Sequence, residues 1–141
     1  MILIDSNVVI DMFDKSGEWK AWSTDAVAEA GTDHELAITP IVVAEVAPRA
    51  GSLEEFFEGI ARLGVTISDL SNEAAYSAGI AFNVYRQRRR AHGDSFRSII
   101  ADFLIGGHAQ VLGATILTRD PRFYRTYFPS VPLITPETSA P

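Results

Sequence analysis

Residues 101–108 read Ala101-Asp102-Phe103-Leu104-Ile105-Gly106-Gly107-His108, an apolar run that a single carboxylate interrupts. Apolar residues recur around it at intervals of three and four, which is typical of a helix with one face toward a core. They are Phe96, Ile99, Ile100, Phe103, Leu104, Val111 and Leu112. Asp102 lies within this pattern, so we expect it near the buried face. A carboxylate there is costly unless a partner or a cation compensates its charge.

The composition is that of one folded domain. The chain has 141 residues, of which 47% are apolar, and no apolar run is long enough to span a bilayer. The amino terminus lacks the basic start of a signal peptide. The absence of cysteine excludes disulfides, thiolate zinc sites and cysteine nucleophiles. We expect a cytoplasmic protein without a membrane segment, in which residues 1–135 form one domain and residues 136–141 a short tail.

The charge is unevenly distributed. A net charge of −6 argues against bulk, non-specific binding to nucleic acid. The twelve basic residues include two lysines, so ten are arginines, and four of these lie close together as Arg86, Arg88, Arg89 and Arg90. Arginine binds phosphate through two parallel hydrogen bonds. The run is therefore either a phosphate-binding patch or a solvated helix end.

Short apolar segments alternate with helical patterns along the chain. Residues 2–4, 36–39, 65–67 and 115–118 are typical of strands buried on both faces. Helices are expected at residues 8–13, 18–30, 53–63, 71–91 and 121–127, around residues 101–112, and from Pro40, with Thr39 as N-cap, until Pro48. This alternation predicts an α/β fold, a three-layer α/β/α arrangement around a mainly parallel central sheet.

Four carboxylates are expected at one edge of that sheet. Asp5 follows the first strand, Glu45 lies in the helix after the second strand, and Asp120 lies two residues beyond Thr118 at the end of the fourth. Ligand sites of parallel sheets form at these carboxyl ends, and the helix of Asp102 packs on the same sheet. Four acids would repel one another unless a divalent cation neutralised them. Oxygen ligands alone select Mg²⁺ or Mn²⁺, which suits phosphoryl chemistry.

Neighbouring polar residues have a supporting role in this hypothesis, and simpler interpretations remain. Ser6, Asn7 and Thr118 are able to orient the carboxylates. Asp5 and Asp120 are also good N-caps of the helices that they precede, and Glu45 alone is typical of an exposed helical glutamate. Asp94 is interpreted as the N-cap of the helix that follows it. The aromatic cluster of Phe123, Tyr124, Tyr127 and Phe128 is interpreted as packing, and the three histidines show no ligand spacing.

The ordered set of motifs resembles a PIN domain of the VapC kind, the toxin half of type II toxin–antitoxin pairs. The matching segments are Ile2-Leu3-Ile4-Asp5-Ser6-Asn7, Val43-Ala44-Glu45, Ile100-Ala101-Asp102-Phe103-Leu104-Ile105, Ile116-Leu117-Thr118-Arg119-Asp120-Pro121-Arg122-Phe123, and the ending from Tyr127 to Pro136. The resemblance implies a PIN-like fold and a homodimeric, magnesium-dependent endoribonuclease that a cognate antitoxin neutralises.

The family's metal ligands correspond to Asp5, Glu45, Asp102 and Asp120, and its polar helpers to Asn7 and Thr118. Two positions depart from the family pattern. Many members have threonine at the position of Ser6, and many have alanines at the positions of Gly106 and Gly107, where glycine loosens a helix or allows a close helix contact.

The leading hypothesis is RNA phosphodiester cleavage by a metal-activated water, with Arg119 and the arginines of residues 86–90 positioning the RNA backbone. A magnesium phosphatase of the haloacid-dehalogenase type is a weaker alternative, because that chemistry needs a second acid where Asn7 stands. A PIN module that binds RNA or protein without turnover is the other alternative.

Overall fold

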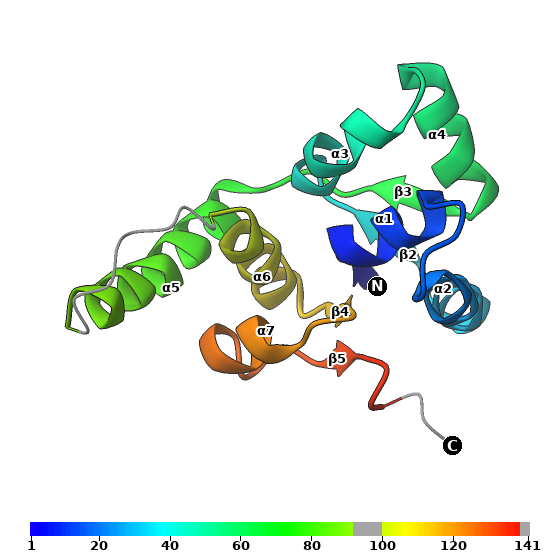
Figure 1. The fold of residues 1–141 in the computed structure, drawn as a ribbon. Helices are drawn as coiled ribbons and strands as arrows, with labels where there is room; N and C mark the ends of the chain where they lie inside the picture. Colours follow the sequence, from blue (N-terminus) through cyan, green and yellow to red (C-terminus); the bar gives the residue numbers. More distant parts are fainter. Residues whose placement is uncertain (92–99, 139–141) are drawn as a thin grey trace.

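A five-stranded parallel sheet lies at the centre of the protein (Figure 1). The structure is a computed structural model that describes residues 1–91 and 100–138. The strands follow the order β3-β2-β1-β4-β5, and all four neighbouring pairs are parallel. Their bounds are β1 Ile2–Ile4, β2 Leu36–Ile38, β3 Val65–Ile67, β4 Thr115–Leu117 and β5 Leu133–Ile134.

Helices connect the strands and flank the sheet. They are α1 Ser6–Phe13, α2 Lys20–Asp33, α3 Pro40–Val46, α4 Leu53–Arg62, α5 Asn72–Ala91, α6 Ile100–Leu112 and α7 Arg122–Tyr127, with a 3₁₀ turn at Ala47–Arg49. In the view of Figure 1, α5 and α6 lie on one side of the strands and α2 and α4 on the other. The arrangement confirms the three-layer α/β/α prediction. None of the described helices is long and apolar enough to cross a membrane.

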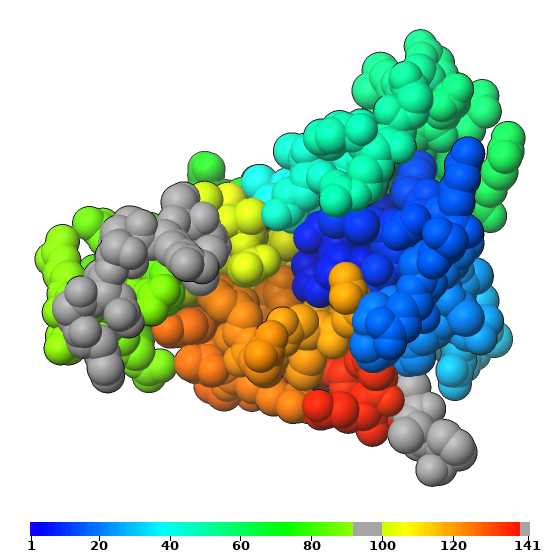
Figure 2. Space-filling model, viewed as in Figure 1, coloured from blue at the N-terminus to red at the C-terminus, as the bar shows by residue number. Residues whose placement is uncertain are grey.

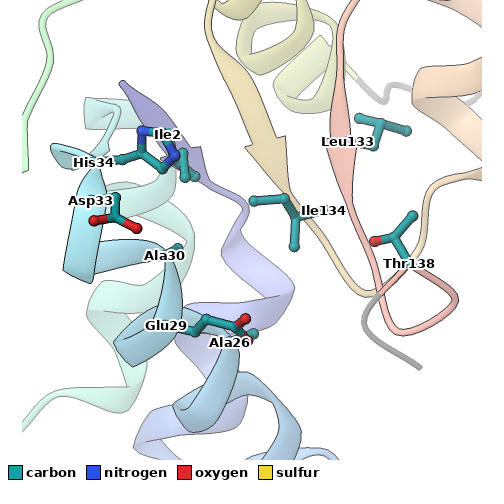
Figure 3. Close-up of a pocket in the computed structure, with 9 residues that line it drawn as sticks. All are labelled: Ile2, Ala26, Glu29, Ala30, Asp33, His34, Leu133, Ile134 and Thr138. Atoms are coloured by element: carbon teal, nitrogen blue, oxygen red, sulfur yellow. The ribbon is translucent and has the colours of Figure 1, made fainter. Parts of the chain in front are cut away.

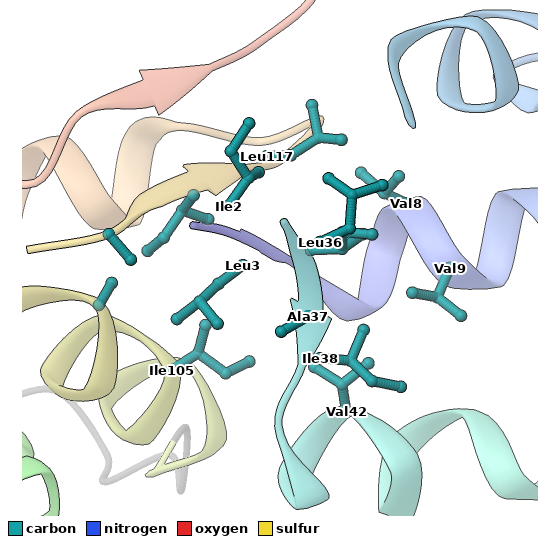
Figure 4. Packing of buried hydrophobic residues seen from close by; sticks show 14 of the residues in the cluster. Ile2, Leu3, Val8, Val9, Leu36, Ala37, Ile38, Val42, Ile105 and Leu117 are labelled. Carbon is teal, nitrogen blue, oxygen red and sulfur yellow. The ribbon is translucent and has the colours of Figure 1, made fainter. Parts of the chain in front are cut away.

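The strands form the core because nearly all their side chains are apolar. Leu3, Ile4, Ile38, Ile116 and Leu117 are 2% exposed or less. Residues of β1 and β2 pack with Val8 and Val9 of α1, Val42 of α3 and Ile105 of α6 (Figure 4). Central strands covered on both faces need such continuous apolar segments. The three-residue strands thus place the polar residues that follow them at one edge of the sheet.

Glycine allows α5 and α6 to lie unusually close together. A Cβ atom on Gly107 would lie 2.6 Å from the backbone oxygen of Ala74 and 2.7 Å from the backbone nitrogen of Ala78. A Cβ atom on Gly106 would overlap the ring of Phe128. Of the two roles predicted for these glycines, the packing supports close helix contact at Gly107, whereas Gly106 makes room for the Phe128 ring. The contact fixes α6, and with it Asp102, against the rest of the fold.

Some sequence predictions need correction. Ile100, Val111 and Leu112 were expected to face the core, but they are 40%, 43% and 47% exposed. The three- and four-residue intervals mark more than one side of α6, and only one side is covered. Helix α2 begins and ends later than predicted, at Lys20 and Asp33. The predicted cap Asp94 and the apolar residues Phe96 and Ile99 lie outside the described residues.

The chain beyond β5 has specific contacts. The backbone nitrogen of Thr135 donates a hydrogen bond of 2.8 Å to the Thr138 hydroxyl, and Arg125 of α7 forms an ion pair of 2.7 Å with Glu137. Residues 136–138, the start of the predicted tail, thus take part in one local hydrogen bond and in one ion pair with α7.

Candidate active site

Asp5 lies at the centre of the candidate site. It follows β1 directly and caps α1, as one of its two interpretations predicted, and it is 3% exposed. Its Oδ1 accepts a hydrogen bond of 2.8 Å from the backbone nitrogen of Ser6. Its Oδ2 accepts hydrogen bonds of 3.1 Å from Asn7 Nδ2 and 2.7 Å from the Thr118 hydroxyl. Burial raises the pKa of Asp5 although these donors favour the charged carboxylate.

Asn7 and Thr118 connect the ends of β1 and β4. The Thr118 hydroxyl donates to Asp5, so its lone pairs accept from Asn7 Nδ2 at 3.1 Å and from the backbone nitrogen of Asp120 at 3.2 Å. Asn7 Oδ1 accepts a hydrogen bond of 3.1 Å from the backbone nitrogen of Arg119. The two side chains therefore hold the segment that carries Asp120 against Asp5. The Ser6 hydroxyl is only at the limit of a hydrogen bond to Asp5, at 3.5 Å.

Asp102 and Glu45 bring their charges to the same place. Asp102 lies in the first turn of α6 and is half-buried. Burial and the charges of Asp5, Glu45 and Asp120 together raise the pKa of Asp102 to about 7. Glu45 of α3 is half-buried, and its buried Oε2 has no hydrogen-bond partner among the described residues. We call Asp5, Glu45, Asp102 and Asp120 the acid site.

Several segments of the chain meet at this edge. Figure 2 shows one face of the molecule, where the dark blue amino-terminal segment, the cyan start of α3, the yellow start of α6 and the orange segment after β4 lie together. Three of these segments directly follow a strand, namely β1, β2 or β4, and the fourth is the start of α6. This is where parallel sheets form their ligand sites.

Asp120 belongs to this edge, but its carboxylate is turned to Arg122. Arg122 Nε and Nη2 donate hydrogen bonds of 2.9 and 2.7 Å to its two oxygens, and the Arg122 backbone nitrogen lies 3.3 Å from Oδ1. The hydrogen bonds from Arg122 hold the pKa of Asp120 below its ordinary value. Among the described residues, no three acidic or histidine side chains are gathered into a ready metal site.

The residues nevertheless fit a divalent cation. The buried, unpartnered Oε2 of Glu45 is an acceptor that a cation would satisfy, and buried polar atoms without a partner are rare. The raised pKa of Asp102 has the charges of three other acids among its causes, and a cation bound between them would remove that repulsion. Carboxylate oxygens without sulfur or paired imidazoles favour hard ions.

The structure identifies Tyr124 as a residue that the sequence reasoning assigned only to packing. It is 1% exposed, and its pKa is well above the ordinary value because of burial and the charges of Asp5, Asp102 and Glu45. The hydroxyl lies close to Asp5, but no hydrogen bond of good geometry joins it to a described residue. The sequence around Tyr124 and Tyr127 does not distinguish them, so no local signal could have singled out Tyr124.

Arg119 has two close partners. Its Nε lies 3.0 Å from Oδ2 of Asp11, and its guanidinium carbon lies 5.8 Å from the centre of the Trp19 ring. Asp11 is buried and also accepts a hydrogen bond of 2.9 Å from the Ser23 hydroxyl. The sequence reasoning missed Asp11, because an acid in the middle of a helix is usually exposed. One third of the Arg119 side chain remains exposed.

Three arginines of the run at the end of α5 lie over aromatic rings. The guanidinium carbons of Arg86, Arg88 and Arg89 lie 5.9, 5.4 and 5.5 Å from the rings of Phe82, Tyr127 and Tyr85 respectively. Arg90 is exposed. The Tyr127 ring in turn lies 5.1 Å from that of Phe103, the neighbour of Asp102. The run is thus connected to the helix of Asp102 through two aromatic rings.

A groove of about 510 Å³ lies elsewhere, between α2 and β5 (Figure 3). Ile2, Glu29, Asp33, His34 and Ile134 are among the residues that line it, and none of the four predicted acids is. Ile2 begins the strand that Asp5 follows, so the groove is at the other end of β1. Its volume therefore does not bear on the chemistry of the acid site.

Comparison with known proteins agrees with the geometry. The sequence matches the family described as PIN domain over residues 2–129. No curated protein sequence matches the chain. The family match covers both the segment that contains Asp5 and the segment that contains Asp120.

Solved structures share the fold at low sequence identity. One neighbour is a chain of VapBC2 from Rickettsia felis, solved in complex with a DNA fragment from the VapBC2 promoter. It is 20% identical with a TM-score of 0.65, over 96% of this chain and 98% of that one. VapBC-1 from nontypeable Haemophilus influenzae is 17% identical with a TM-score of 0.65, over 96% of this chain and 98% of that one. VapC20 from Mycobacterium tuberculosis is described as a toxin that cleaves the sarcin–ricin loop. It is 12% identical with a TM-score of 0.59, over 94% of this chain and 99% of that one.

Proposed function

Because the chain belongs to the PIN domain family, we propose that it is a metal-dependent endoribonuclease, the toxin of a toxin–antitoxin pair. The observation that carries the proposal is the electrostatic coupling of Asp5, Glu45, Asp102 and Asp120, which come from four separate segments. Neighbouring carboxylates of which one is buried and two are half-buried reduce stability, so they are expected where a function requires them. The fold shared with toxins of VapBC complexes supports the biological role.

Asp5, Glu45, Asp102 and Asp120 would hold one or two Mg²⁺ or Mn²⁺ ions. When bound, the metal supplies an activated water and stabilises charge on the phosphate oxygens. The polar residues orient the ligands: the Ser6 backbone, Asn7 and Thr118 fix both oxygens of Asp5. Asp102, with its pKa of about 7, is partly protonated at neutral pH without the cation.

RNA is the proposed substrate. Arg88, which lies over the Tyr127 ring, is held near the helix of Asp102 by the aromatic cluster. A guanidinium stacked on a ring still has N–H groups at its edge that are able to donate to phosphate. We propose that Arg86, Arg88, Arg89 and Arg90 bind the RNA backbone beyond the scissile bond. One third of the Arg119 side chain is exposed, and Arg119 is proposed to contact a phosphate nearer to Asp120.

The proposed partners are a cognate antitoxin and a second copy of the chain, acting in the cytoplasm. The neighbours are described as toxin–antitoxin assemblies, which supports the antitoxin. Tyr76, Ile80 and Val84 form an apolar stripe along α5 and are 73%, 55% and 40% exposed. An exposed stripe of this kind is typical of a surface that another chain covers, which supports a homodimer.

The test is RNA cleavage by the purified chain in Mg²⁺, with the ends of the products mapped. Asp5→Asn and Asp102→Asn are expected to abolish cleavage while circular dichroism shows an intact fold. Asp25→Asn removes an exposed charge from α2, away from the acid site, and is expected to retain full activity. Undiminished cleavage by either site variant would contradict the assignment. RNA binding without cleavage by the wild type would favour a non-catalytic PIN module.

A further inference from the structure

Asp120 differs from the other acids of the acid site because its carboxylate is paired with the guanidinium of Arg122. The charges of Asp5 and Asp102 repel one another. In contrast, the two oxygens of Asp120 accept hydrogen bonds of 2.9 and 2.7 Å from one guanidinium. The Arg122 backbone nitrogen adds a third, longer contact of 3.3 Å. A carboxylate with these contacts has few lone pairs left for a metal ion.

We propose that Arg122 is a positioning residue that holds the Asp120 carboxylate away from the metal, so that a divalent cation must displace the guanidinium to recruit Asp120. The proposal rests on the function proposed above, since it requires that the acid site binds a cation. It assigns Arg122 a role in setting the metal affinity of the site.

The backbone around Asp120 is fixed, so only its side chain needs to move. The Asp120 backbone nitrogen donates a hydrogen bond of 3.2 Å to the Thr118 hydroxyl, and the neighbouring Arg119 nitrogen donates one of 3.1 Å to Asn7. Thr118 and Asn7 both contact Asp5. Rotation of the Asp120 side chain alone therefore changes which partner it meets, Arg122 or the other acids.

The strength of the pair permits such an exchange. The side chains of Arg122 and Asp120 are 86% and 49% exposed. Exposed ion pairs are weak, even though a bidentate geometry places them at the upper end of the range. A divalent cation that already has Asp5, Glu45 and Asp102 as ligands offers Asp120 a stronger partner than one solvated guanidinium. The pair thus lowers metal affinity without preventing binding.

The same helix provides a matched control. Arg125 lies one turn after Arg122 and forms an ion pair of 2.7 Å with Glu137, which is not one of the four acids. Arg122→Gln and Arg125→Gln remove the same charge from the same helix. Only the first releases a carboxylate of the acid site. Arg122→Lys retains the charge but pairs at a single point.

The experiment is a calorimetric titration of the metal-free chain with Mn²⁺ alone. Arg122→Gln is expected to bind Mn²⁺ about two- to fivefold more tightly than the wild type, the factor that an exposed ion pair is worth. Arg125→Gln is expected to match the wild type, and Arg122→Lys to lie between the wild type and Arg122→Gln. A merely structural role of Arg122 would weaken binding rather than tighten it.

Two results would overturn the inference and can be told apart. If the wild type binds Mn²⁺ and Arg122→Gln binds it no more tightly, or Arg125→Gln tightens binding as much, Arg122 does not compete for Asp120 and the proposed function stands. If the wild type does not bind Mn²⁺, the proposed metal site fails, and the inference fails with it.

Discussion

The Thr118 hydroxyl donates a hydrogen bond of 2.7 Å to Oδ2 of Asp5, joining the ends of the adjacent strands β4 and β1. Thr118 is fully buried and its oxygen also accepts from Asn7 and from the backbone of Asp120. One hydroxyl thus orients a carboxylate and positions the segment of another acid.

Thr118→Val is expected to reduce RNA cleavage and to lower the free energy of unfolding by about 1–3 kcal/mol, because buried donors lose their acceptor. The variant retains the shape of the side chain. Cleavage assays and denaturant unfolding would measure the two effects. Thr118→Ser, which retains the hydroxyl, should keep most of the activity. Wild-type activity and stability in Thr118→Val would show that the hydrogen bonds have little importance.

Asp102→Asn is expected to stabilise the metal-free protein. Because the pKa of Asp102 is raised from 3.8 to about 7, the folded chain binds a proton that the unfolded chain has lost within this window. The free energy of unfolding therefore falls as pH rises from 3.8 to about 7 and stays low above it. Solvent screening of this half-buried group reduces the effect, so we expect about 1–2 kcal/mol at pH 8.

Thermal melts of the wild type and Asp102→Asn, at pH 5 and pH 8 and with and without Mg²⁺, would test this. Mg²⁺ should stabilise the wild type and have little effect on the variant. A buried ion pair would give the opposite result, since its loss costs about 3–5 kcal/mol.

Metal binding is expected to depend on pH through Asp102. Below a pKa of about 7 the carboxyl is protonated and must lose its proton to bind a cation. Mn²⁺ affinity should therefore rise about tenfold per pH unit up to neutrality and level off above it. Calorimetric titrations between pH 5.5 and 8.5 would measure this dependence. His34→Asn removes an exposed histidine that lies in the groove at the other end of β1 and should leave the profile unchanged, whereas a flat wild-type profile would contradict the prediction.

Gly107→Ala is expected to lower the free energy of unfolding by about 2–3 kcal/mol, because the new methyl group meets backbone atoms of α5 rather than the end of a flexible side chain. Gly79 provides the control: it lies on the exposed side of α5, and a Cβ atom added there would have nothing within 4 Å. Gly79→Ala should raise the free energy of unfolding by about 0.5–1 kcal/mol through helix propensity. Equal effects of the two substitutions in chemical denaturation would disprove the packing argument.

The sequence by itself determined the parallel α/β fold and the edge at which the acids meet. Ile2-Leu3-Ile4 and Leu36-Ala37-Ile38 are apolar throughout because both faces of their strands are covered. A polar residue directly after such a strand, such as Asp5, has its place in the fold set by local chain order alone. The prediction that Thr39 caps the start of α3 likewise follows from local sequence, and the Thr39 hydroxyl oxygen accepts a hydrogen bond of 3.4 Å from the Val42 nitrogen.

Only the tertiary structure decided which side of a helix is covered and where side chains turn. Val111 of α6 follows the apolar spacing but is exposed, because the spacing does not say which side of the helix its neighbours cover. The turn of Asp120 toward Arg122, the place of Tyr124 beside the acids and the pairing of Asp11 with Arg119 depend on contacts between segments distant in sequence or on rotamer choices. Such contacts form after the elements pack, so no local pattern of residues encodes them.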